Sequence, residues 1–357
     1  MVIQPYISIL CFCLLKSCIS NFSLRLPSAI FGVINVLVFY LICRNIFSQK
    51  YKRYQSFLSF LTALIFLTLR WYFNFVRFSF EMPFLLFLEL TSIFFLLEYF
   101  SHQQTKSLIW SGLFAGFAFN CYQPGRIFFL VPLLALFLKK VSRKQLIMFL
   151  IPLIITITPV TIYLIKNNPD DIRFHKQFFL KNTELSIQKK LEFLGENISK
   201  TALMFNVKSD INARHNYPGK AILNPILGFF FLTGLIITII NIRDFYSQFF
   251  LFYFFISLLP TNVTYPWENP NMLRTFTAIP SLIFFIIQSL YFSISLIKKN
   301  NKLRLMMLFI FIIIFSISSI YEIRTYFKYQ VISFPQAFEM RTDLKQFVKN
   351  KDFMEFE

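Results

Sequence analysis

The stretch LPSAIFGVINVLVFYLICRNIFSQKYKR, residues 26–53, decides the class of this protein. From Leu26 to Phe47 it is almost continuously apolar, and it is long enough to cross the roughly 30 Å hydrocarbon core of a bilayer as a helix. The run ends in Lys50, Lys52 and Arg53, and such a basic cluster is typical of the cytoplasmic end of a membrane-spanning helix. The stretch therefore predicts an integral membrane protein.

The rest of the chain repeats this pattern. The 357 residues are 56% hydrophobic, which is more than an ordinary soluble domain contains. We predict an all-α, polytopic membrane protein with about ten transmembrane helices, because apolar runs of spanning length recur between short polar connections. The predicted spans are 26–47, 54–70, 83–100, 107–122, 124–138, 146–165, 223–241, 247–260, 273–297 and 303–320.

The distribution of basic residues predicts the orientation. The net charge of +19 does not require a nucleic-acid partner, because Lys and Arg gather at alternate ends of the spans, as the positive-inside rule describes. The predicted domain is 1–320, with a large extracytoplasmic loop at 166–222 and an extracytoplasmic tail at 321–357 that looks truncated. The apolar segment 3–15 is short for a span and is better explained as an interfacial or re-entrant helix.

The large loop contains a predicted amphipathic helix. Ile187, Leu191, Leu194 and Ile198 recur at helical spacing with charged residues between them. Such a helix either lies on the membrane surface or caps a cavity between the spans. In the fourth span, Gly112 and Gly116 form a G-x-x-x-G pair, which predicts close packing against another helix.

Polar residues on the predicted outer side are the candidates for a site, since charges near membrane depth usually face a cavity. Four arginines come from four separate outer connections, and arginine forks match phosphate oxygens bidentately, so they predict binding of a phosphorylated, membrane-embedded ligand. Each also has a structural explanation, such as a helix-end salt pair between Arg77 and Glu81 or snorkelling by Arg126. The candidates are Arg77, Glu81, Tyr122, Arg126, Asp210, Arg214, His215, Asn216, Glu268 and Arg274.

Neither a metal site nor a cofactor site is indicated. The cysteines, Cys11, Cys13, Cys18, Cys43 and Cys121, lie in apolar sequence without the paired spacing of metal ligands, and they are best explained as small buried hydrophobic residues. His215 has no second ligand at helical spacing. We therefore expect no cofactor, and the sequence leaves metal dependence open.

Several blocks resemble a known superfamily. FSLRLPSAIFGVINVLVFYLICRNIF (22–47), VRFSFEMPFLLFLEL (76–90) and GLFAGFAFNCYQPGRIFFLVPLLAL (112–136) are similar, in this order, to blocks of the GT-C glycosyltransferases. This superfamily contains the protein O-mannosyltransferases and the aminoarabinose transferases. DINARHNYPGKAILNPILGFFFLTGL (210–235) and NPNMLRTFTAIPSLIF (269–284) resemble its later blocks.

The resemblance implies transfer of a sugar from a polyprenyl-phosphate carrier to a lipid, glycan or protein acceptor at the outer membrane face. It also implies that Arg126 and Arg274 hold the donor phosphate. Arg214, His215 and Asn216 would line the loop side of the cavity, with Arg77 and Glu81 in support. The family's acidic first outer loop and the span before it have no counterpart before Pro5, so we expect a fragment, or substitution by Glu81 or Asp210 as the catalytic carboxylate.

Two other classes of function stay open on the sequence. A transporter or flippase of lipid-linked saccharides would use the same ligands, although the sequence shows no clear internal repeat. A membrane scaffold without catalytic activity would fit the absence of the acidic loop.

Overall fold

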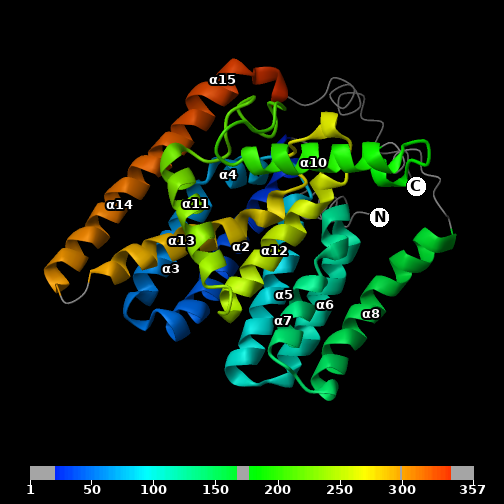
Figure 1. Ribbon diagram of the computed structural model, residues 1–357, viewed down its shortest axis with the longest axis horizontal. Coiled ribbons are helices and arrows are strands. Elements are labelled where there is room, and N and C mark those ends of the chain that lie inside the picture. The colour runs from blue at the N-terminus through cyan, green and yellow to red at the C-terminus, as the bar shows by residue number, and fades with distance from the viewer. Residues whose placement is uncertain (1–20, 167–176, 298–299, 339–357) are drawn as a thin grey trace.

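The computed structural model describes residues 21–166, 177–297 and 300–338. Within these ranges the fold is all-α, as predicted, and its β structure is confined to an isolated bridge between Phe178 and Thr264 (Figure 1). The predicted interfacial segment 3–15 and most of the C-terminal tail lie outside the described residues. Cys11, Cys13 and Cys18 do so as well, whereas Cys43 and Cys121 are buried free thiols.

The first half of the chain forms a row of packed helices: α2 (Asn21–Lys50), α5 (Met82–His102), α6 (Thr105–Cys121) and α8 (Arg143–Lys166). Helix α2 packs on α5, α5 on α6, and α6 on α8. A Cβ atom added to Gly112 would lie 2.1 Å from the Phe149 carbonyl oxygen, and one added to Gly116 would lie 1.7 Å from the Thr156 hydroxyl. The predicted role of this glycine pair in close helix packing is confirmed.

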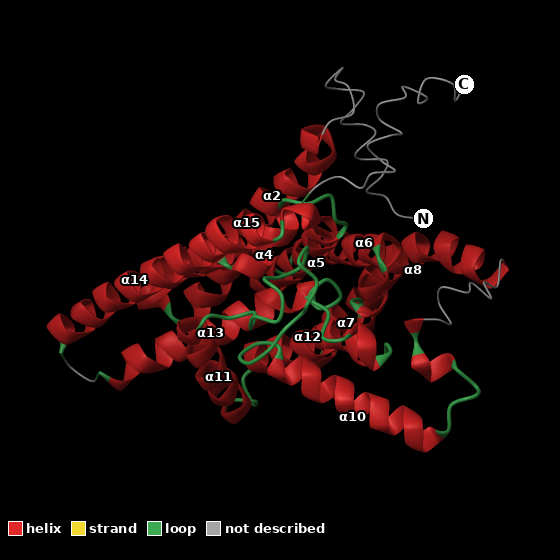
Figure 2. Ribbon diagram, turned by 90° about the horizontal axis from the view of Figure 1, so that it is seen from above, coloured by secondary structure: helices red, strands yellow, loops and turns green. Residues whose placement is uncertain are grey.

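The second half contributes α11 (Pro225–Ile240), α12 (Phe245–Asn262), α13 (Ile279–Leu296) and α14 (Asn301–Arg324). Helix α11 packs closely on α13, with Gly234 against the backbone of Phe285. Beyond Arg324 the chain continues through a π-helical turn, Thr325–Gln330, into α15 (Val331–Ser333). Helices α8 and α14 form opposite edges of the molecule in both views (Figures 1 and 2), and the apolar faces that they expose are suited to lipid contact.

Each predicted span coincides with a helical segment. Fewer of these segments are long and apolar enough to cross a membrane. Five described helical segments are long and apolar enough to cross, and a bent pair makes a possible sixth. The segments Gln123–Leu138 and Pro225–Ile240 are apolar but shorter. The structure thus confirms a polytopic helical fold and does not confirm a count of ten.

The predicted span 54–70 contains a break that the sequence analysis did not foresee. Helices α3 (Gln55–Thr68) and α4 (Arg70–Val76) meet at Leu69, whose backbone is extended, and the two are bent by 59°. The bend directs Arg70 into the protein, where its Nε atom donates to Glu322 of α14 at 3.1 Å. Both side chains are almost fully buried, so Arg70 is part of the core and not of an exposed outer connection.

The polar ends of this buried pair are well satisfied. Arg70 also donates to Asn216 and to the Ala221 carbonyl oxygen, and Asn224 donates to the second carboxylate oxygen of Glu322 at 2.8 Å. A buried charge pair is tolerated only with such additional hydrogen bonds. The network ties the loop before α11 to α4 and to the end of α14.

The predicted amphipathic helix is α10 (Ile187–Leu203), which runs crosswise over the upper ends of the other helices in Figure 1. Its apolar stripe at Ile187, Leu191 and Ile198 is exposed. Its opposite face packs on the protein, where Asn197 donates to the carbonyl oxygens of Asn262 and Thr264. The helix therefore holds the segment that follows α12.

Candidate functional site

The first candidate site is a cavity between the turn after α6 and the end of α12. Its volume is about 340 Å³. We call it the arginine cavity, because two arginines line it and its other walls are largely apolar. It is lined by Tyr122, Gln123, Pro124, Arg126, Ile127, Phe178, Leu259, Pro260, Val263 and Arg274.

A tight turn positions the first arginine. The residues Gln123–Ile127 form a 3₁₀ turn that leads into α7 (Leu130–Leu138), so the turn predicted at Pro124 and Gly125 is present. A Cβ atom at Gly125 would lie 2.3 Å from the Ala118 carbonyl oxygen, so the close approach requires glycine. Arg126 is partly buried here, and it has no ion-pair or hydrogen-bond partner among the described residues.

The second arginine comes from the segment after α12. Arg274 forms a salt bridge through Nη2 with Glu268, and its side chain is 11% exposed. Its other terminal nitrogen, Nη1, is buried and has no hydrogen-bond partner among the described residues. An unsatisfied buried guanidinium nitrogen is costly, and an anion in the cavity would satisfy it.

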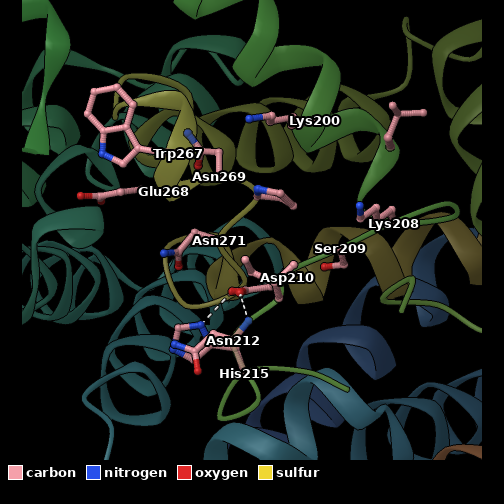
Figure 3. Close-up of a pocket in the computed structure, with 13 residues that line it drawn as sticks. Lys200, Lys208, Ser209, Asp210, Asn212, His215, Trp267, Glu268, Asn269 and Asn271 are labelled. Atoms are coloured by element: carbon pink, nitrogen blue, oxygen red, sulfur yellow. Dashed lines mark hydrogen bonds and ion pairs between the residues drawn. The ribbon is translucent and has the colours of Figure 1, made fainter. Parts of the chain in front are cut away.

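The salt bridge between Glu268 and Arg274 joins a residue that lines a second cavity to one that lines the arginine cavity. This second cavity, of about 550 Å³, we call the tryptophan cavity. In Figure 3, Trp267 and Glu268 lie on one side and Lys200 and Lys208 on the other. It is lined by Lys200, Leu203, Lys208, Ser209, Asp210, Ile211, Asn212, His215, Trp267, Glu268, Asn269, Pro270 and Asn271.

Asp210 and His215, both predicted site residues, lie together at the tryptophan cavity (Figure 3). The Asp210 carboxylate is 2.8 Å from His215 Nδ1 and accepts hydrogen bonds from the backbone amides of Asn212 and Met272. Its oxygens are thus committed to holding the loop 210–216 against the segment 269–275. The Nε2 atom of His215 has no partner among the described residues.

Other predicted residues lie elsewhere. The exposed guanidinium of Arg77 lies over the rings of Phe73, Tyr326 and Phe327, at 4.7 to 5.5 Å from their centroids, and lines neither cavity. It forms no salt bridge with Glu81. Asn216 is buried in the Arg70 network, so it serves the packing of the loop.

Arg214 and Glu81 also lie outside the two linings. The side chain of Arg214 is half-buried and has no partner among the described residues, while its backbone carbonyl accepts a hydrogen bond from Asn74. Glu81 is close enough to Cys121 and Tyr122 for its charge to act on both side chains. Glu81 lines neither cavity, and its role stays a prediction.

Glu268 is a candidate carboxylate to which the sequence alone assigned no role. It lines the tryptophan cavity, and the arginine that it contacts lines the other cavity. The sequence contained a signal for it, since Glu268 and Arg274 are two opposite charges in one short Pro- and Asn-rich outer segment. In the part of the chain that the structure describes, no three His, Cys, Asp or Glu side chains are grouped to hold a metal ion.

The fold and the paired cavities define a class: a polytopic helical membrane protein with a charged site at one end of its helices. Residues 2–165 match the model of the dolichyl-phosphate-mannose-protein mannosyltransferase family. The structure is similar to that of the Archaeoglobus fulgidus oligosaccharyltransferase tethered to an acceptor peptide containing the NVT sequon, with a TM-score of 0.51 and 13% sequence identity. The family model matches 164 of the 357 residues and the structural likeness shows a shared fold, and both agree with the GT-C resemblance of the sequence blocks.

The structural match covers a larger share of this chain than of the archaeal protein. It covers 89% of this chain and 46% of the archaeal protein, so the chain spans about half the length of that relative. A comparison with curated proteins found no sequence similar enough to count as a match.

Proposed function

We propose that this protein transfers a sugar from a polyprenyl-phosphate carrier to an acceptor at the extracytoplasmic face of the membrane. The observation that carries the proposal is the arginine cavity, where Arg126 and the unsatisfied Nη1 atom of Arg274 face apolar walls. A lipid-linked phosphate needs both kinds of surface, since its anionic head requires donors and its isoprenoid chain requires an apolar path.

The chemistry follows from charge development at the phosphate. The acceptor hydroxyl oxygen attacks the anomeric carbon of the sugar, and the bond from that carbon to the phosphate oxygen breaks, so that polyprenyl phosphate leaves with an additional negative charge. Arg126 and Arg274 would stabilise this charge, which grows as the bond breaks. Arg274 is already held by Glu268, so its unsatisfied Nη1 atom requires little reorganisation for this task.

A carboxylate must accept the proton of the acceptor hydroxyl. We assign this role to Glu268, because it lies at the boundary of the two cavities and only its Oε2 atom is bonded to Arg274. Asp210 is less suitable, since its oxygens already accept three hydrogen bonds. Glu81, next to Tyr122, is the second candidate, and Glu81→Gln can be compared directly with Glu268→Gln.

The test begins with binding of the donor. The full chain, in detergent or nanodiscs, is titrated with a C55 polyprenyl phosphate. Arg126→Ala is expected to weaken binding about 10- to 100-fold, because a charge-assisted hydrogen bond contributes about 1.5–3 kcal/mol. Arg53→Gln is the matched control, since Arg53 lines neither cavity and donates to Asn301 at the protein surface.

Transfer is then followed with a radiolabelled polyprenyl-phosphate sugar. If Arg126→Ala and the wild type bound the carrier with equal affinity, Arg126 would have no role in binding the phosphate. Movement of the intact carrier across a vesicle membrane, without transfer of its sugar, would indicate a flippase instead. Binding without either event would indicate a scaffold.

A further inference from the structure

The tryptophan cavity has its own lining, and the Glu268–Arg274 pair joins it to the arginine cavity, to which the proposed function assigns the donor phosphate. We propose that the tryptophan cavity binds the acceptor and that this acceptor is a carbohydrate. The proposal rests on the proposed function only where it identifies the bound carbohydrate as the acceptor. The carbohydrate site itself is argued from the residues that line the cavity.

An exposed aromatic platform is the first observation. The Trp267 side chain is 71% exposed, and its ring stacks on Tyr265 at a centroid distance of 4.4 Å and an interplanar angle of 16°. The Tyr265 hydroxyl accepts a hydrogen bond from Asn182, and Lys200 donates to the carbonyl oxygen of Pro266, so the platform is held from two sides. A rigid aromatic face with negative potential suits the C–H face of a pyranose ring.

Unsatisfied polar groups are the second observation. The Ser209 hydroxyl is buried in the cavity wall without a hydrogen-bond partner among the described residues, and Ser209 is 1% exposed. His215 Nε2 and the Lys208 ammonium also lack partners there. A buried hydroxyl is normally paired, so Ser209 lacks a partner that a sugar hydroxyl would supply, and His215 Nε2 and the ammonium of the exposed Lys208 are open to further hydroxyls.

The charges of the lining favour a hydroxyl-rich ligand over a phosphate. Lys200 is paired with Glu196 at 2.8 Å, Asp210 with His215, and Glu268 with Arg274. Among the described residues this leaves Lys208 as the lining residue without a charge partner, whereas Arg126 and Arg274 both line the arginine cavity. The two cavities thus have different chemistry on either side of one salt bridge.

The position of the cavity fits an acceptor. A sugar lying on Trp267 would have Glu268, the adjacent residue in the chain, beside its hydroxyl groups. The volume of about 550 Å³ is within the range of small-molecule sites. An acceptor bound there would approach the donor across the salt bridge.

The test measures oligosaccharide binding in the absence of any donor. The full chain in nanodiscs, with Trp110→Phe to remove a lipid-exposed fluorophore, is titrated with mannotriose, chitotriose and maltotriose. Trp71 remains as a buried fluorophore, so a change in emission that is lost in Trp267→Phe reports on Trp267. We expect a saturable change with at least one trisaccharide, confirmed by calorimetry.

The matched variants locate the site. Trp267→Ala is expected to weaken calorimetric binding about tenfold or more, Trp267→Phe to keep it within about threefold, and Ser209→Ala to weaken it severalfold. Since Trp267 is exposed, its replacement leaves the fold intact. Binding of none of the three sugars, or equal binding by Trp267→Ala, would overturn the proposal.

Two further outcomes are decisive. If brominated lipid chains quench Trp267 and a saturating trisaccharide does not protect it, Trp267 is a membrane anchor and the proposal fails. Arg126→Ala is expected to leave trisaccharide binding unchanged while it lowers binding of the polyprenyl phosphate. Failure of the donor experiment alone would therefore refute the proposed function and leave this carbohydrate site standing.

Discussion

Replacing Glu268 by glutamine is expected to change donor binding and sugar transfer in opposite directions. The carboxylate neutralises Arg274, so a donor phosphate must compete with it for the guanidinium. Glu268→Gln keeps the shape and a hydrogen-bonding oxygen but removes the negative charge. Arg274 is then free to pair with the phosphate, while the proton acceptor is lost.

The magnitude follows from the exposure of the pair. Two unit charges about 4 Å apart attract by about 4 kcal/mol at an effective dielectric constant of 20. Solvent screens this attraction, because the side chain of Glu268 is 29% exposed, and the amide retains part of the interaction. We expect a net gain of about 0.7–1.4 kcal/mol, which is about 3- to 10-fold tighter binding of the polyprenyl phosphate.

The assay pairs calorimetric titration of the C55 carrier with single-turnover transfer of a radiolabelled sugar. Transfer is expected to fall about 100-fold or more, since general-base catalysis contributes about 10²- to 10⁴-fold. Glu192→Gln, in the exposed Lys189–Glu192 pair of α10, is the matched control and should change neither quantity. Arg274→Gln is expected to weaken carrier binding, since it removes the guanidinium. If Glu268→Gln weakened carrier binding as well, the pair would be structural and the reasoning would be refuted.

Two predictions concern the fold. Glu322→Ala leaves the buried Arg70 without its carboxylate and is expected to lower the free energy of unfolding by about 3–5 kcal/mol. The measurement is the midpoint of thermal unfolding in detergent, which should fall strongly for Glu322→Ala and less for Glu322→Gln. An unchanged midpoint would contradict the ion-pair network. Gly116→Leu places a side chain where even a Cβ atom meets Thr156, so it should separate α6 from α8 and lower the same midpoint, whereas Ile109→Leu, at an exposed position of α6, should not. Normal stability of Gly116→Leu would show that the two helices do not need their close contact.

Periodicity and length predicted the helices well, because each apolar run had to satisfy its own backbone hydrogen bonds in a membrane. The sequence also predicted the G-x-x-x-G packing and the turn before Arg126. It could not predict the break at Leu69, since no proline or glycine marks it. The pairing of Arg70 with Glu322 spans 252 positions, and one sequence contains no signal for such a contact.

The same limit applied to the site. Four arginines on one predicted face suggested a single cluster, but the fold directs Arg126 and Arg274 into one cavity and Arg77 onto a group of aromatic rings. Spacing along the chain predicts a membrane face for each residue, but it does not predict the direction in which the side chain points. The place of Glu268 between two cavities depends on the fold, because it lines one cavity and contacts an arginine that lines the other.

Helix α10 connects the segment before the site to an exposed apolar stripe. One face of this helix holds the segment 262–266, directly before Trp267 and Glu268, through Asn197 and Lys200. The other face is an exposed stripe of isoleucine and leucine. A helix with such a stripe suits a membrane surface, and in that position acyl chain length and head-group packing would bear on the segment before Trp267 and Glu268, with bilayer thickness as one variable of the site's geometry.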